Sequence, residues 1–81
     1  MPENLIEMAE EEGFKQGWSD CLAGAAKMPF PDIGFSLLEP GYVKHFNAAY
    51  YDAYETAREE QRRRAALEAR RSHEQSEQRE R

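Results

Sequence analysis

The chain has 81 residues, of which 33% are charged and 40% are apolar, and its formal net charge at pH 7 is −5. This length allows one small domain, whose core supplies only about 3–5 kcal/mol of stability, so we expect self-association or a partner to add to it. The single cysteine excludes an intramolecular disulfide, and Cys21, His45 and His73 lie too far apart in the sequence to form a metal-ligand motif.

The sequence favours a soluble, cytoplasmic protein. The N-terminal Met-Pro-Glu-Asn has no basic segment followed by an apolar one, as a secretory signal requires. No stretch approaches the run of about 20 apolar residues that spans a membrane. We therefore expect neither a signal peptide nor contact with a membrane, and a free thiol agrees with this.

The charge is divided unevenly along the chain. Residues 1–57 contain ten acidic residues and three lysines, a net charge of −7, whereas residues 58–81 contain eight arginines and six glutamates, a net charge of +2. An acidic globular part disfavours contact with phosphate groups. Contact with the ribosome or with RNA is therefore expected only through the arginine-rich part.

Two related stretches, Phe14–Cys21 and Phe46–Ala53, organise the sequence. Both have Phe, a small residue, a second aromatic residue and Asp at the same spacing, 32 residues apart. Asn4 and Glu7 resemble a capping box, and we expect a helix over about residues 4–27. Along it, small residues recur every four positions and form a shallow groove on one face: Ala9, Gly13, Gly17, Cys21 and Ala25.

Residues 28–39 are expected to connect this helix to a second one. Pro29 and Pro31 end the first helix, because they lack a backbone donor and push the preceding residue toward an extended conformation. Ser36 and Glu39 are expected to cap one short turn. The connection is unusually apolar, so we expect its side chains to fold back over one end of the helix pair; an exposed docking patch is the alternative.

The second helix is expected to begin at about residue 40 and to carry an aromatic row, Tyr42, Phe46, Tyr50 and Tyr54, at four-residue spacing. Such a row complements the groove of small residues. The predicted fold is therefore all-α, an antiparallel helical hairpin over residues 1–57, with or without internal two-fold symmetry. The expected packing residues are Gly13, Phe14, Gly17, Trp18, Cys21, Phe46, Ala49, Tyr50 and Ala53.

Residues 58–81 change character and contain Leu67 as their only large apolar residue. Charge pairs at i,i+4, such as Glu59–Arg63 and Glu60–Arg64, each stabilise a helix by about 0.2–0.5 kcal/mol. We expect the second helix to continue as a solvated extension that frays after about residue 71.

Catalytic motifs are absent from the sequence: it contains no glycine-rich phosphate loop, paired histidine ligands or nucleophile–base pattern. Asp20 and Asp52 are the repeated carboxylates, and two helices offer little room for a catalytic dyad. We expect no enzyme, no cofactor and no small-molecule substrate. The candidate partner-binding residues are Phe30, Phe35, Leu38, Tyr51, Tyr54, Arg62, Arg63 and Arg64.

Residues 12–57 resemble the ribosome modulation factor family of small bacterial proteins. The resemblance is carried by Gly13-Phe14-Lys15-Gln16-Gly17, by a connection that contains Pro29 and Pro31, and by Phe46-Asn47-Ala48-Ala49-Tyr50. It implies a helix-linker-helix fold and binding to the ribosome in translation control. The family is strongly basic and has a glycine where Asp20 stands, so these residues depart from its pattern.

Together these features predict a small, non-catalytic regulatory protein that binds and modulates a larger protein partner, with a homodimer as one expected state. A ribosome-associated translation regulator is the alternative. A second alternative, suggested by the acidic residues 1–57, is an inhibitor of a nucleic-acid-binding protein encoded by a mobile element.

Overall fold

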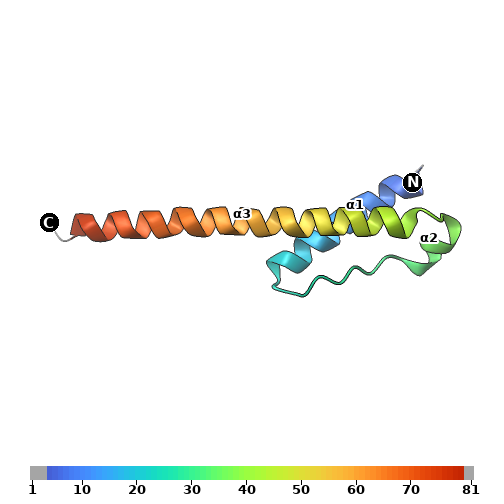
Figure 1. The fold of residues 1–81 in the computed structure, drawn as a ribbon, viewed down its shortest axis with the longest axis horizontal. Coiled ribbons are helices and arrows are strands. Elements are labelled where there is room, and N and C mark those ends of the chain that lie inside the picture. The colour runs from blue at the N-terminus through green and yellow to red at the C-terminus, as the bar shows by residue number, and fades with distance from the viewer. Residues whose placement is uncertain (1–3, 80–81) are drawn as a thin grey trace.

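The computed structural model describes residues 4–79, with the side chains of residues 4–72. They form three helices: α1 (Leu5–Leu22), the short α2 (Ile33–Leu38) and the long α3 (Tyr42–Arg79) (Figure 1). Residues 4–79 contain no strand, and α1 packs against the first half of α3. The predicted all-α class and the pairing of two long helices are therefore confirmed.

Local capping determines both ends of α1. The Asn4 side chain accepts a hydrogen bond from the backbone N–H of Ile6 at 2.8 Å, as an N-cap does. At the other end, Gly24 has a φ of +73°, and the N–H groups of Gly24 and Ala25 donate to the carbonyls of Cys21 and Asp20. This pair of backbone hydrogen bonds is the Schellman motif, which ends a helix. The helix therefore stops at Leu22 rather than at about residue 27, and Ala25 does not extend the groove.

The direction of the two long helices differs from the predicted antiparallel arrangement. Both run the same way and cross obliquely, because residues 25–32 return as an extended segment beside the pair (Figure 1). Eight extended residues reach about 26 Å, which matches the roughly 27 Å length of an 18-residue helix. The residue numbers of contacting residues increase in the same direction along both helices: Ile6 lies near Gly41, Gly13 near Phe46 and Gly17 near Tyr50.

Two glycines bring the backbones of α1 and α3 into contact. A methyl group on Gly13 would collide with the carbonyl oxygen of Phe46, and one on Gly17 with that of Tyr50. Glycine destabilises a helix interior by about 1 kcal/mol relative to alanine. At these two positions the absence of a side chain is what allows the two backbones to approach closely. The core is formed by Ala9, Cys21, Tyr42, Phe46, Tyr50, Ala53, Tyr54 and Ala57.

The short helix α2 is capped by Asp32, whose side chain accepts from the N–H of Phe35 at 3.0 Å. The expected cap by Ser36 and Glu39 is therefore wrong: Ser36 donates to the carbonyl of Asp32, and Glu39 accepts from the N–H of Gly41. A turn at residues 39–41 then leads into α3, which begins at Tyr42.

Beyond the end of α1, α3 continues as a single helix to Arg79, and its side chains over residues 61–72 are exposed to solvent. Glu60 pairs with Arg64 at 3.4 Å and with Arg63 at 3.9 Å; the latter replaces the expected Glu59–Arg63 pair. We call residues 62–79 the extension. It gives the molecule a length of 66 Å against a width of 24 Å (Figure 1).

Candidate functional site

The groups that most often perform chemistry are engaged in structural contacts. Cys21 is buried, and its Sγ lies 3.5 Å from the Oε1 of Gln61. His45 Nδ1 lies 3.3 Å from a carboxylate oxygen of Glu10. Among residues 4–72, no group of three or more His, Cys, Asp or Glu side chains is placed to hold a metal ion. No helix in the described part of the chain is long and apolar enough to cross a membrane.

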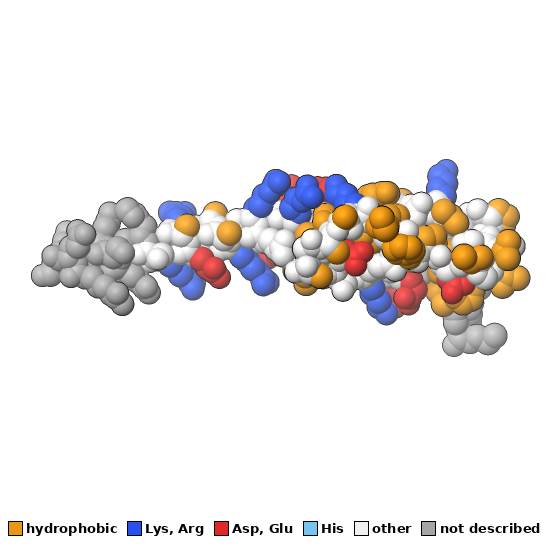
Figure 2. Space-filling model, turned by 90° about the horizontal axis from the view of Figure 1, so that it is seen from below, with side chains coloured by type: hydrophobic (Ala, Val, Ile, Leu, Met, Phe, Trp, Pro, Cys, Tyr) orange, Lys and Arg blue, Asp and Glu red, His pale blue; other side chains and the backbone are white. Residues whose placement is uncertain are grey.

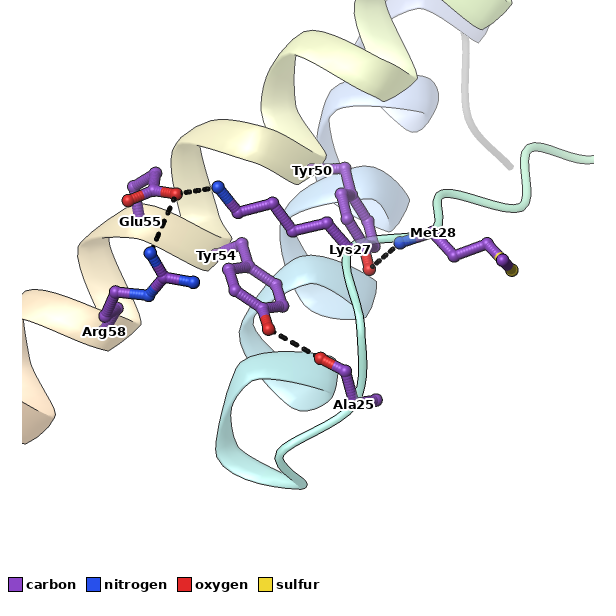
Figure 3. Close-up of polar contacts among 7 residues, drawn as sticks. All are labelled: Ala25, Lys27, Met28, Tyr50, Tyr54, Glu55 and Arg58. Carbon is purple, nitrogen blue, oxygen red and sulfur yellow. Dashed lines mark hydrogen bonds and ion pairs between the residues drawn. The ribbon is translucent and has the colours of Figure 1, made fainter.

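Tyr50 of α3 bonds both to the extended connection and to α1, and Figure 3 shows its bond to Met28. Its hydroxyl donates to Asp20 of α1 at 2.5 Å and accepts from the backbone N–H of Met28 at 2.9 Å. Burial raises the pKa of Tyr50, and the hydrogen bond to the Asp20 carboxylate raises it further. Asp20, the first of the two repeated carboxylates, therefore holds the fold together, whereas its counterpart Asp52 is exposed.

Tyr54 provides a second attachment (Figure 3). Its hydroxyl donates to the carbonyl of Ala25 at 2.5 Å, and the Lys27 ammonium and the Arg58 guanidinium each lie 5.4 Å from its ring centroid. Lys27 also pairs with Glu55, and this bond lowers the pKa of the Glu55 carboxyl. Tyr54 was expected to contact a partner; the structure instead buries it, since its ring and hydroxyl fill the space beside the connection.

The apolar side chains of the connection do not fold back over the helix pair as a group. Four are largely exposed: Phe30 (68%), Ile33 (77%), Leu37 (82%) and Leu38 (73%). We call these four residues the connection surface. Phe35 is different, because its ring packs 5.6 Å from that of Tyr42 and is half-buried. The expected covering of one end is thus limited to Phe35, and the exposed patch predominates.

Figure 2 looks onto the side of the molecule along which the connection runs. It shows hydrophobic side chains gathered over the part where the helices pair, and charged side chains spread along α3 beyond it. An exposed apolar surface of this kind on a small protein is typical of a site that binds another protein. The candidate functional site is therefore this exposed apolar surface.

An open groove of about 550 Å³ adjoins the connection surface and shares Phe30 with it, and we call it the aromatic groove. Four aromatic residues contribute to it, together with carboxylates from α1 and from the cap of α2. Its lining residues are Met8, Glu12, Lys15, Gln16, Phe30, Asp32, Phe35, Tyr42 and Phe46. Gln16 also fixes the groove's edge, because its Oε1 accepts from the backbone N–H of Phe30 at 2.7 Å.

The predicted packing residues fall into two groups. Those that lie buried between the helices are Gly13, Gly17, Cys21, Phe46, Tyr50 and Ala53, with Ala49 half-buried beside them. Trp18 is half-buried and packs against this core, whereas Phe14 is 42% exposed and stacks on the Trp18 ring with the ring centroids 5.9 Å apart. Their counterparts Phe46 and Tyr50 are fully buried, so the sequence repeat does not produce equivalent environments.

The remaining candidate residues are exposed on α3. Tyr51 is partly exposed and meets the edge of Tyr50, and Arg62, Arg63 and Arg64 face solvent. At helical spacing, arginines at positions 63 and 70 lie on one side of Leu67, and those at 64 and 71 on the other. The connection surface and these arginines occupy opposite parts of the molecule, and no single site combines them.

Sequence reasoning missed the hydrogen bonds that attach the connection. Gln16 and Asp20 lie at i and i+4, on the flank of α1 next to the buried small residues, and this spacing was the available signal. It does not identify the partners, which lie 14 and 30 residues away in the sequence.

The comparisons with known proteins add no further information on the site. No protein-family model, no curated protein and no solved structure gives a significant match to this chain. The resemblance to the ribosome modulation factor family thus stays a prediction that depends on the short motifs alone.

Proposed function

We propose that this chain is a small, non-catalytic interaction protein that binds and modulates a larger protein partner through the connection surface. The observation that carries the proposal is the exposure of Phe30, Ile33, Leu37 and Leu38 on one short segment. Contiguous exposed apolar patches larger than a few hundred Å² are rare on monomeric proteins and commonly mark interfaces with other proteins.

The attachment of the connection supports the same proposal. Backbone groups of Ala25, Met28 and Phe30 are hydrogen-bonded by side chains of α1 and α3. Residues 25–30 are therefore held by hydrogen bonds, and α2 is held by the packing of Phe35 on Tyr42. The side chains of Phe30, Ile33, Leu37 and Leu38 stay exposed on this anchored segment. A surface that is ordered before binding loses less conformational entropy when a partner docks.

The test compares partner capture by matched variants. In Ile33→Ser/Leu37→Ser, two exposed side chains of the connection surface become polar, and we expect capture of the partner to be lost. The control, Leu67→Ser, changes an exposed leucine on the extension. Far-UV circular dichroism should show native helix content for both, because neither change touches the core. Equal capture of the same protein by the double variant and the wild type would contradict the proposal.

A ribosome-associated role in translation control is the second candidate. It is favoured by the exposed Arg62, Arg63 and Arg64 on a helix that projects away from the acidic part of the molecule (Figure 1). Arginine side chains of this kind bind phosphate oxygens, and the resulting affinity falls steeply with salt.

Gradient sedimentation separates the two candidates. The ribosomal role predicts that the protein co-migrates with ribosomal particles, and that replacing Arg62, Arg63 and Arg64 by glutamine abolishes this while Ile33→Ser/Leu37→Ser does not. Migration at the top of the gradient at low salt would exclude the ribosomal role. The connection-surface variant would then still test the first proposal.

A further inference from the structure

The aromatic groove has a shape and a charge that suit one kind of guest. We propose that it binds an arginine side chain of the protein partner, seated against Phe30 and Phe35 and paired with Glu12 and Asp32. This inference rests on the proposed function and adds the position of a specific contact and the chemistry of the partner.

Buried aromatic rings form the floor of the groove. Phe35, Tyr42 and Phe46 form a row with successive ring centroids 5.6 and 6.1 Å apart, and Tyr42 and Phe46 are almost inaccessible. The rings that remain accessible in the groove are those of the half-buried Phe35 and of Phe30, which is exposed at its edge. A volume of about 550 Å³ lies within the range of sites that bury a ligand group. A planar guanidinium stacks on such ring faces.

Carboxylates at the groove give it an acidic character. Glu12 comes from α1 and Asp32 from the cap of α2. Burial is the main reason that the pKa of Tyr42 is raised, and the negative charges of Asp32 and Glu12 raise it further. Lys15 is the one cation among the lining residues, and its Nζ is shared between Glu11 at 3.5 Å and Glu12 at 3.9 Å. Two lining carboxylates against one shared ammonium leave a site that attracts a cation.

The arginines at positions 62–64 of the same chain do not reach the groove. Arg62 lies 16 residues beyond Phe46 on one continuous helix, a distance of about 24 Å that leads away from the groove (Figure 1). The nearer Arg58 is engaged elsewhere, beside the Tyr54 ring and the Glu55 carboxylate, so the arginine comes from another molecule. Residues 1–57 carry a net charge of −7, so the electrostatic field of this part of the chain also favours a basic partner.

Fluorescence anisotropy with the full-length protein tests the site directly. The probe is a labelled twelve-residue peptide of alternating glycine and arginine, compared with the same peptide containing neutral citrulline in place of arginine. We expect the citrulline peptide to bind at least about tenfold more weakly. Glu12→Gln/Asp32→Asn should weaken binding of the arginine peptide about tenfold, since two exposed charge contacts are lost. The asparagine at position 32 keeps an N-cap for α2.

Matched controls separate the groove from general charge attraction. Glu11→Gln/Asp52→Asn removes the same charge from exposed positions outside the groove and breaks the other Lys15 pair, and it should change affinity less than threefold. Phe30→Ala should weaken binding several-fold, whereas Leu37→Ala should not. Equal losses in the two double variants, or equal binding of the arginine and citrulline peptides, would overturn the inference.

A second copy of the chain is the remaining occupant to exclude. Light scattering of the wild type should show no association that depends on Arg62, Arg63 and Arg64. If replacing them by glutamine abolishes a dimer that Glu12→Gln/Asp32→Asn also abolishes, the groove binds the extension of a second copy, and the partner assignment is wrong. If partner capture survives Glu12→Gln/Asp32→Asn but is lost in Ile33→Ser/Leu37→Ser, the arginine site fails and the proposed function stands.

Discussion

Replacing Gly17 by alanine tests the close approach on which the fold depends. Alanine at a helix interior position stabilises the helix by about 1 kcal/mol relative to glycine. Here, however, the added methyl group would overlap the carbonyl oxygen of Tyr50, a backbone atom that cannot rotate out of the way. Overpacking against a fixed neighbour costs about 1–3 kcal/mol or more. We expect the upper part of this range, and hence a net loss of about 1–2 kcal/mol.

For a domain of this size, such a loss lowers the melting temperature by about 10 °C. Urea unfolding followed by far-UV circular dichroism and by the fluorescence of Trp18, the neighbouring residue, measures the change. The control is Ser19→Ala, an exposed position on the same helix, which should be neutral or slightly stabilising. If Gly17→Ala is as stable as Ser19→Ala, the two backbones do not meet there and the reasoning is refuted.

Gly13 provides a second test of the same contact. Its methyl group would overlap the carbonyl of Phe46, one helical turn earlier on each helix. Either substitution forces α1 away from α3. Once one added methyl group has separated the helices, the second methyl group meets less steric overlap. The double variant should therefore lose less stability than the sum of the two single losses, as expected for coupled positions. Strict additivity would indicate that the two contacts are independent.

Three further predictions concern the ends and attachments of the helices. Tyr50→Phe should cost about 1–2 kcal/mol in urea unfolding at pH 7, because Asp20 loses a donor. The pKa of Tyr50 is raised in the folded state, so the protonated hydroxyl contributes fully to the free energy of unfolding below pH 10. This contribution is lost as the pH rises through the raised pKa of the folded state. The wild type should therefore lose more stability between pH 9 and 12 than Tyr50→Phe does. An equal loss would mean that this hydroxyl does not hold its proton more tightly when folded. Gly24→Ala should lower the melting temperature by an amount equivalent to about 1 kcal/mol through its positive φ alone, since nothing lies within 4 Å, and no change would contradict the capping geometry. Truncation after Gln61 should preserve the melting temperature, whereas truncation after Ala57 should lower it by removing Arg58 and Gln61; identical curves would show that these contacts add nothing.

The helical faces were predictable because they depend on local spacing. Small residues at every fourth position and an aromatic row at the same period each define one face, and those faces meet in the structure. The Asn4 cap was likewise visible, since its side chain acts only two residues away. Features set within one or two helical turns could thus be inferred from the sequence.

The direction of the helices was not predictable on the same basis. A groove of small residues accepts an aromatic row in either direction, so periodicity alone does not decide between them. The deciding features are the cap at Gly24, which ends α1 early, and the eight residues that follow, which are just long enough to return along it. The attachments by Gln16, Tyr50 and Tyr54 are long-range, and no local pattern identifies their partners.

The same attachments explain why an apolar segment remains exposed on a small protein. A connection can be ordered by burying its own side chains or by having its backbone bonded from outside. Here the side chains of Gln16, Tyr50 and Tyr54 bond the backbone of the connection, and only Phe35 is drawn into the core. Side-chain donors and acceptors thereby replace the burial that would otherwise hold the segment. The apolar side chains are left free to bind, and the surface they form is ordered before a partner arrives.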